Sequence, residues 1–343
     1  MGLRELSTRP CPVLSLAPMQ DVTDLPFWSV THRYGAADVY FTEYFRVHKH
    51  STPERFILRS IDENPTGRPV VAQMIGRDIP HLVRTAVELQ KHNVIGIDLN
   101  MGCPAPVVCN KHAGGGLLRN LEETNDILLA LRDAVQCDFT VKTRVGFESE
   151  DEFDRLLDLF ASHPIDALSI HGRTVKEKYQ SPIHYDRIRQ AVERMDCPVY
   201  ANGNVVSVAL AQRTLDETGA AGLMIGRGAI RNPWLFAQIR SHFDPTLPDH
   251  AGPTLSDLHQ YICDLFDAIP KPGVAEKLHV KKMKRYMNYI GQGVDPDNQF
   301  LHQIRRAETK AEFFAICDKF LLNDTRLPEE PPATSAVFAG LAG

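Results

Sequence analysis

The sequence predicts an α/β fold, a (β/α)8 TIM barrel followed by a small C-terminal all-α domain. Eight short apolar runs occur between residues 13 and 225, and helical patterns separate them. Apolar runs without polar alternation are typical of strands that are buried on both faces of a parallel sheet. Eight strand–helix units in about 230 residues fit a closed barrel, which typically takes about 250 residues. Beyond residue 245 only amphipathic helical patterns continue.

The predicted elements alternate along the chain. Asp24 is placed to cap the first helix, and Pro26 lies in its first turn. We expect strands at 13–17, 38–42, 69–74, 95–100, 139–143, 167–171, 199–201 and 222–225, and helices at 24–32, 79–92, 121–135, 151–162, 185–195 and 205–217. The alternative is an open, doubly wound sheet, but no G-x-G-x-x-G motif follows the first strand.

The chain divides into three predicted segments. Residues 1–245 form the barrel, residues 250–325 form the helical domain, and residues 326–343 are expected to be disordered. Pro245, Pro248 and Pro253 mark a linker between the first two segments. Within the helical domain we expect helices at 255–269, 275–290, 301–306 and 311–322. The tail is rich in proline and small residues, which bury too little apolar surface to fold alone.

The charge of the chain is unevenly distributed. The net charge is −5, but residues 271–310, Lys271 included, carry nine lysines and arginines against four acidic side chains. This segment therefore has a net charge of +5, and the rest of the chain carries −10. A basic helical surface on an acidic protein indicates a nucleic-acid partner. The alternative is an ordinary solvated helix face.

The cysteines and the apolar runs limit the class of protein. The seven cysteines are odd in number and follow no disulfide spacing, and no secretory signal precedes them, so we expect reduced thiols and a cytoplasmic protein. No apolar run approaches 18 residues, so no membrane span is predicted. Cys103 and Cys109 have only His112 near them, so no metal site is predicted.

Residues 95–118 are the most informative stretch. A predicted strand ends at Asn100, and Cys103 follows between Gly102, which is free in φ, and Pro104, whose φ is fixed. This arrangement is suited to holding a reactive thiol at the end of a strand. The glycines at 114–116 are expected to let the backbone approach a ligand closely. The alternative for Cys103 is an inert cysteine packed in the core.

Polar residues follow nearly every predicted strand. In a barrel the carboxyl ends of all strands open onto one face, where active sites are built. The glycine turns at 203 and 226–228 follow strands seven and eight, where many barrels bind a phosphate group. The strand-end residues are Pro18, Met19, Glu43, Gln73, Asn100, Cys103, Lys142, Arg144, His171, Arg173, Asn202, Asn204 and Arg227. The sequence therefore predicts a site for a polar ligand with a phosphate at one end.

Six motifs along the chain resemble the signatures of the tRNA-dihydrouridine synthases. They occur in the family's order, and the resemblance runs from about residue 12 to residue 325. The motifs are LAPMQDVTD at 16–24, DLNMGCP at 98–104, VKTRVG at 141–146, HGRT at 171–174, ANGN at 201–204 and IGRG at 225–228. The resemblance implies a flavin-dependent barrel and a helical domain that grips tRNA. It also implies reduction of the C5–C6 double bond of specific uridines, with FMN re-reduced by NADPH.

The resemblance also assigns roles to individual residues. Cys103 would give the proton to C5 after hydride reaches C6 from reduced FMN, and free thiols, with pKa values of about 8.5, are largely protonated at neutral pH. Asn100 and Arg173 would face the uracil and the flavin. The implied cofactor residues are Pro18, Met19, Gln73, Lys142, His171, Asn202, Gly203, Asn204, Gly226 and Arg227, and the implied tRNA contacts are Lys281, Lys282, Lys284 and Arg285. We expect a monomer.

Three alternative functions are compatible with parts of the sequence. A different FMN barrel that acts on a small molecule would need no basic helical domain. A non-catalytic RNA-binding protein would not need Cys103, Lys142 and His171 together. A Schiff-base aldolase could use Lys142, but Cys103 would then have no function. We therefore favour the tRNA-dihydrouridine synthase.

Overall fold

The computed structural model of the protein describes residues 2–269 and 275–341. Lys271, which belongs to the predicted basic segment, and the last two residues of the predicted tail lie outside this range. Within it, no helix is long and apolar enough to cross a membrane.

Eight parallel strands close into a barrel, which confirms the predicted fold. The ring is completed where Tyr40 of the second strand pairs with Val70 of the next one. The closure excludes the open, doubly wound sheet. The strands of the ring are β1 (Val13–Leu16), β2 (Val39–Phe41), β4 (Val70–Ile75), β5 (Gly96–Met101), β6 (Asp138–Arg144), β7 (Ala167–His171), β8 (Val199–Asn202) and β9 (Gly222–Ile225), and the two-residue β3 (Phe45–Arg46) pairs with β4 alone.

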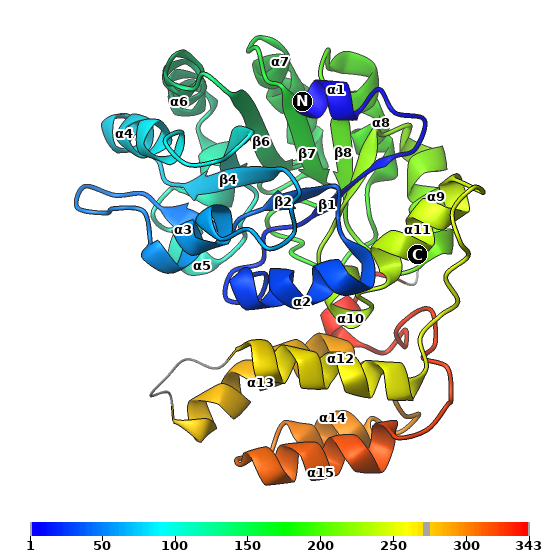
Figure 1. Ribbon diagram of the computed structural model, residues 1–343. Helices are drawn as coiled ribbons and strands as arrows, with labels where there is room; N and C mark the ends of the chain where they lie inside the picture. The colour runs from blue at the N-terminus through cyan, green and yellow to red at the C-terminus, as the bar shows by residue number, and fades with distance from the viewer. Residues whose placement is uncertain (1, 270–274, 342–343) are drawn as a thin grey trace.

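Helices surround the barrel, and their ends are capped as the sequence suggests (Figure 1). Asp24, Asp78 and Asn120 each accept a hydrogen bond from the backbone N–H three residues later. The outer helices are α2 (Leu25–Gly35), α3 (Arg55–Asp62), α4 (Ile79–Leu89), α6 (Leu121–Ala134), α7 (Phe153–Ala161), α8 (Tyr185–Arg194), α9 (Val208–Thr218) and α11 (Leu235–Phe243). The sequence pattern misses α3 and α11.

The short α1 (Leu3–Leu6) lies at the end of the barrel where the strands begin. Leu3 and Leu6 are buried in one cluster with Val13, Phe41 and residues that point into the barrel. The Leu3 N–H also donates to Asp138 at the start of β6, over 2.7 Å. This apolar cluster closes the end of the barrel where the strands begin. The opposite end, where the strands finish, is therefore left for a ligand.

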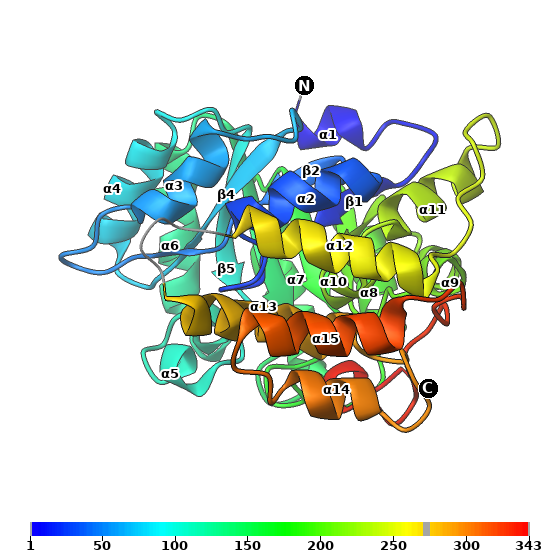
Figure 2. The ribbon, with the colours of Figure 1, turned by 60° about the horizontal axis from the view of Figure 1, so that its bottom comes forward.

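The helical domain lies at the carboxyl ends of the strands, below the barrel in Figure 1 and in front of it in Figure 2. Its helices are α12 (Leu255–Ala268), α13 (Glu276–Ile290), α14 (Gln299–Ile304) and α15 (Lys310–Leu321). Capping boxes at Thr254 and Thr309 begin α12 and α15. Aromatic contacts join the domain to the barrel: Tyr286 stacks on Phe27 at 5.9 Å, and Tyr261 meets Tyr34 edge-on at 5.4 Å.

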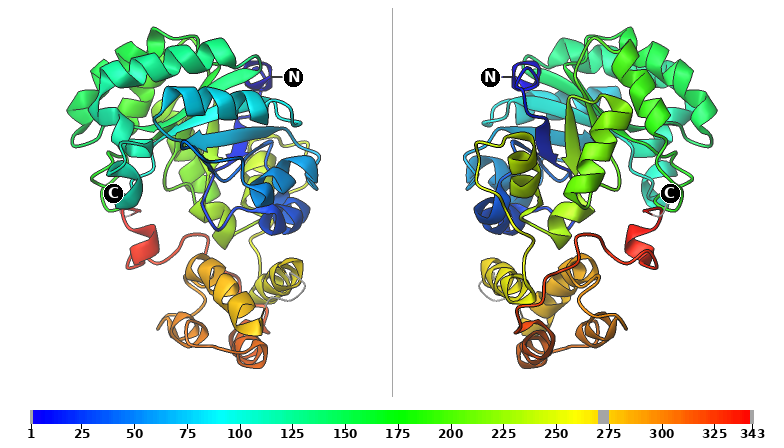
Figure 3. Two further views of the ribbon diagram at one scale, coloured as in Figure 1. Left: turned by 90° about the vertical axis from the view of Figure 1, so that its left-hand side faces the viewer. Right: turned by 90° about the vertical axis from the view of Figure 1, so that its right-hand side faces the viewer.

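The C-terminal tail differs from the predicted disordered segment. It runs from the helical domain back to the barrel (Figure 3) and includes the single turn η3 (Ala336–Phe338). Arg231, in α10 (Arg227–Arg231), donates to the carbonyl groups of Pro328 and Glu329, and Phe338 is 1% exposed. Composition did not reveal this course because the partners that order the tail lie about a hundred residues earlier in the chain.

Candidate functional site

A cavity of about 630 Å³ lies at the carboxyl ends of the strands. This volume is within the range of about 300–1,000 Å³ that small-molecule sites occupy. The predicted site residues that line it are Pro18, Met19, Asn100, Cys103, Lys142, His171, Asn202, Gly203, Asn204, Gly226 and Arg227. The barrel therefore brings together side chains that are as far apart in the sequence as Pro18 and Arg227.

The backbone around Cys103 is held by a side chain from the end of β5. Asn100 Oδ1 accepts hydrogen bonds from the N–H groups of Gly102 and Cys103, over 3.1 and 3.0 Å. Cys103 itself is half-buried and lines the cavity, so it is not a cysteine packed in the core. Its carbonyl accepts from Gly115 N and from Cys109 Sγ. The thiol is thus presented to the cavity from a loop that is fixed on both sides.

The glycines at 114–116 pack against the cysteine loop instead of approaching a ligand. They lie in η1 (Gly114–Arg119), which follows α5 (Pro106–Cys109). A Cβ on Gly115 would come within 2.6 Å of Val175 and 2.9 Å of the Cys103 carbonyl. Gly114 has a φ of +55°, a conformation that glycine adopts at little cost. The glycines therefore allow close packing behind the thiol.

Gln73 lies behind the cavity and not in its wall. It is fully buried, and its amide donates to Asp98 over 2.8 Å and accepts from Asn100 over 2.8 Å. Thr140 donates to the other oxygen of Asp98. Burial raises the pKa of Asp98 to about 6. This network fixes Asn100, and through it the cysteine loop.

The cavity wall is rich in cations. Lys142, Arg144, Lys178 and Arg227 line it, and no Asp or Glu does so among residues 2–269 and 275–341. Burial, reinforced by Arg144, lowers the pKa of Lys142 to about 8. The Lys142 ammonium donates to Asn202 Oδ1 over 3.0 Å, which leaves two of its three N–H groups for a ligand. An anionic or strongly electron-rich ligand fits this wall.

His171 is neutral at physiological pH. Its burial, followed by the charges of Arg144 and Lys142, lowers its pKa well below the ordinary value. Its Nδ1 is buried and has no hydrogen-bond partner within the described chain, and the same holds for both amide atoms of Gln20, another cavity residue. Buried polar atoms are normally satisfied, so these atoms indicate a bound molecule that completes the site.

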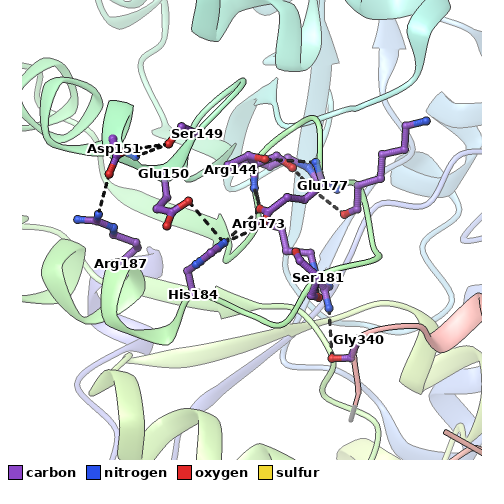
Figure 4. A network of polar contacts seen from close by, with 12 residues as sticks. Arg144, Ser149, Glu150, Asp151, Arg173, Glu177, Ser181, His184, Arg187 and Gly340 are labelled. Carbon is purple, nitrogen blue, oxygen red and sulfur yellow. Dashed lines mark hydrogen bonds and ion pairs between the residues drawn. The ribbon is translucent and has the colours of Figure 1, made fainter. Parts of the chain in front are cut away.

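Two further strand-end residues, Arg144 and Arg173, hold loops together. Arg144 donates to the carbonyl groups of Gly102, Thr174 and Lys178, and so ties the loops after β5 and β7. Arg173 does not line the cavity. It is fully buried and donates to Ser181 O over 2.5 Å, close to the ion pair of Glu177 and His184 (Figure 4).

Several cavity residues were not predicted from the sequence. Tyr179 lies within 4.7 Å of the Arg227 guanidinium and 5.3 Å of that of Arg144. Tyr289 comes from α13, and Ala336 and Val337 come from the tail. The first could have been found by its place after a strand-end motif. The others depend on how distant segments meet, which no local pattern indicates.

The predicted basic residues of α13 separate into two groups. Lys281, Lys284 and Arg285 line a surface groove of about 510 Å³, which we term the basic groove, with Lys277, Arg305 and one acidic residue, Glu308, which pairs with Lys277 over 3.4 Å. Lys282 lies elsewhere. It forms an ion pair with Asp24 over 2.9 Å, so it joins the helical domain to the loop after β1, and Arg285 of the groove also reaches that loop through Asp21, over 3.3 Å. Lys284 donates to the carbonyl groups of Arg305 and Ala307.

Glu43 is buried beside this domain contact, and we expect it to make stability depend on pH. Its carboxylate accepts from the Val22 N–H, and it is 4% exposed. Burial, and then the Asp24 carboxylate, raises the pKa of Glu43 to about 7. The folded state therefore binds more protons than the unfolded state between the ordinary pKa and pH 7, so this group lowers the free energy of unfolding as pH rises through that window.

The variant Glu43→Gln should remove this dependence. Its free energy of unfolding in urea should exceed that of the wild type by more at pH 8 than at pH 5. The control is Glu122→Gln, which replaces an exposed side chain. Its free energy of unfolding should differ from that of the wild type by the same amount at pH 5 and at pH 8. A Glu43→Gln difference that does not change with pH would show that the carboxyl group titrates normally.

No group of three or more His, Cys, Asp or Glu side chains in the described ranges is arranged to hold a metal ion.

Comparisons with known proteins agree with the motifs. Residues 15–325 match the family model of dihydrouridine synthase (Dus). A probable tRNA-dihydrouridine synthase of Helicobacter pylori (strain J99) is 34% identical over 310 residues, which cover 89% of this chain and 86% of the relative. The tRNA-dihydrouridine synthase B of Xanthomonas axonopodis pv. citri is 30% identical over 325 residues, which cover 94% and 96%.

Among solved structures, a more distant protein shares the fold. The 6-hydroxypseudooxynicotine amine oxidase from Pseudomonas geniculata N1 superposes with a TM-score of 0.50 at 10% identity, over 75% of this chain and 50% of that one. At this identity the likeness concerns the barrel architecture alone.

Proposed function

The chain belongs to the dihydrouridine synthase family, and on that basis we propose that it reduces the C5–C6 double bond of specific uridines in tRNA to 5,6-dihydrouridine. The observation that carries the proposal is the position of Cys103, whose thiol lines a cation-rich cavity at the carboxyl ends of the strands, and a helix that carries the basic groove, α13, reaches the same cavity through Tyr289. A thiol in that position suits proton donation to a polar, electron-rich substrate.

The proposed cofactor is FMN, with NADPH as the reductant. The residues present fit this group: the cavity has the size of a cofactor site, and the unpartnered Nδ1 of His171 and the free N–H groups of Lys142 can meet a polar ring. Asn202, Gly203, Asn204, Gly226 and Arg227 lie at the phosphate end predicted for such barrels. When bound, FMN supplies the hydride that adds to C6 of the uracil.

Cys103 then serves as the general acid. Its Sγ proton goes to C5 of the uracil, so that a hydride and a proton together saturate the double bond. Asn100 and Gly115 hold the loop, which keeps the thiol at one place during the transfer. In the proposed site a thiol, rather than a thiolate, is the useful form, since it must deliver a proton.

Lys142 and His171 provide the complementary electrostatics. The ammonium group of Lys142 is protonated below a pH of about 8 and stabilises the negative charge that builds on the reacting rings. His171, which stays neutral, can donate or accept one hydrogen bond without adding a further charge. Gln73 takes a supporting role, because its amide orients Asn100 from behind the wall.

The proposed partner is tRNA, and helix α13 connects it to the chemistry. Lys277, Lys281, Arg285 and Tyr289 follow one another at four-residue spacing along α13; the three cations line the basic groove, and Tyr289 lines the cavity. A uridine that is stacked in folded RNA must leave the stack to reach a buried cavity. Phosphate contacts in the groove can hold the RNA while the base enters the barrel.

The groove leads to a prediction about salt. The double variant Lys277→Ala/Lys281→Ala should weaken tRNA binding and reduce the slope of log K against log salt concentration by about one for each phosphate group that is no longer bound. Binding should be measured by filter retention between 50 and 200 mM salt. Lys91→Ala, beyond the end of α4, is the matched control. A slope that is unchanged in the double variant would place the RNA elsewhere.

The visible spectrum of the purified protein tests the cofactor part of the proposal. Flavin bands should be present, NADPH should bleach them under anaerobic conditions, and tRNA should then restore them. Purified protein that takes up no flavin would instead favour a non-catalytic RNA-binding protein.

A further inference from the structure

We propose that the C-terminal residues 335–341, termed the tail strap, form one wall of the cofactor cavity and retain the ligand by fixing the side chains at its phosphate end. The inference rests on the proposed function, because it needs a ligand with a terminal phosphate. It starts from the fact that Ala336 and Val337 line the cavity beside Asn204 and Arg227.

Two groups of the strap, the Val337 carbonyl and the Phe338 ring, contact the Arg227 guanidinium. The Val337 carbonyl accepts a hydrogen bond from Arg227 Nη1 over 2.5 Å. The guanidinium carbon lies 5.6 Å from the centre of the Phe338 ring in the strap, and 4.7 Å from that of Tyr179 in the loop after β7, so the cation contacts two aromatic rings. Phe338 is buried and meets Tyr289 edge-on at 6.5 Å. An arginine held in this way is pre-organised for an anion.

The end of the strap is fixed by a second contact, to Asn204 and Arg173. The Gly340 carbonyl accepts from Asn204 Nδ2 over 2.5 Å and from Arg173 Nη2 over 3.5 Å (Figure 4). The oxygen of the Asn204 side chain accepts from Arg173 and Arg227. Gly340 has a φ of +76°, and a Cβ there would lie 2.3 Å from the Ser181 carbonyl. Glycine is therefore required at this position.

The strap lines the cavity without filling it. With the strap in place, the cavity still measures about 630 Å³. Of the five N–H groups of Arg227, one donates to the Val337 carbonyl and one to Asn204 Oδ1, so three are left for a ligand. Upstream, Ser207 donates to Glu330 over 2.9 Å, so the segment is anchored before it reaches the cavity.

The test uses the full-length protein loaded with FMN, together with the variants Phe338→Ala and Gly340→Ala. Release of FMN is followed by the rise in its fluorescence on dilution, and affinity is measured by titration with FMN and with riboflavin, which lacks the phosphate. Both variants should release FMN about tenfold faster, which corresponds to removing roughly one aromatic or hydrogen-bond interaction. Riboflavin binding should change less, because the strap acts on the phosphate end.

Gly252→Ala is the matched control, since a Cβ at Gly252 meets nothing within 4 Å. Thermal unfolding should show that all variants keep the barrel. Unchanged release in both variants would overturn the inference and leave the proposed function intact. Tighter FMN binding would overturn it too, by showing that the strap competes with the ligand. Wild-type protein that binds no FMN would remove the proposed cofactor, and the inference with it.

Discussion

Cys103→Ala is expected to lower the rate of dihydrouridine formation by roughly 10²–10⁴-fold, the range that a positioned general acid contributes. The physical reason is that the thiol lines the cavity from a fixed loop, and alanine leaves no proton donor at that place. Binding of FMN and tRNA should stay within about twofold of the wild type, as the side chain is small. Single-turnover kinetics under anaerobic conditions separate the chemical step from binding.

Cys137→Ala is the control for this experiment. Cys137 is also a free, half-buried cysteine, but it lies at the end of the barrel where the strands begin and does not line the cavity. Its replacement should leave the rate unchanged. If Cys103→Ala turned over at the wild-type rate, another group would have to deliver the proton to C5, and the role of Cys103 would be limited to packing.

Lys142→Met is expected to reduce kcat by roughly 10²–10³-fold, the cost of removing one donor that stabilises developing negative charge. Methionine keeps much of the length and the apolar character of the side chain but carries no charge. In the wild type, turnover should fall at alkaline pH, where the charge of Lys142 is lost. Burial lowers the pKa of Lys142 to about 8 in the cavity without ligand, and a bound anionic ligand places the fall above that value.

The pH profile distinguishes this role from a structural one. Lys142→Met should be slow at every pH and should lack the alkaline fall. Lys178→Met removes an exposed lysine from the same cavity and should change KM more than kcat. An alkaline fall that persists in Lys142→Met would assign it to another group, and a normal kcat in that variant would contradict the electrostatic role.

The barrel could be predicted because each of its strands is encoded locally. The runs from Val13 to Ile225 are apolar on both faces, and the barrel buries both faces. The same local pattern predicted that Cys103 and Lys142, which lie at or just after strand ends, are at one end of the barrel. It did not reveal α3 or α11, which are short helices without a strong start signal.

Other parts of the site depend on contacts that no local pattern encodes. Arg227 and Val337 are 110 residues apart, and a tail with many small residues resembles a disordered segment until its partners are known. The charge count over the sequence assigned Lys281 and Lys282 to the same basic segment. On a helix, however, neighbouring residues point about 100° apart, so one lines the basic groove and the other pairs with Asp24.

The most direct test of the proposed function is mass-spectrometric nucleoside mapping of tRNA after anaerobic incubation with the protein and NADPH. We expect one or more defined uridines to gain two hydrogen atoms in the presence of the wild type, and to remain unchanged with Cys103→Ala. A protein that binds and reduces its flavin yet produces no dihydrouridine in any tRNA would contradict the account and point to a barrel that acts on a small molecule.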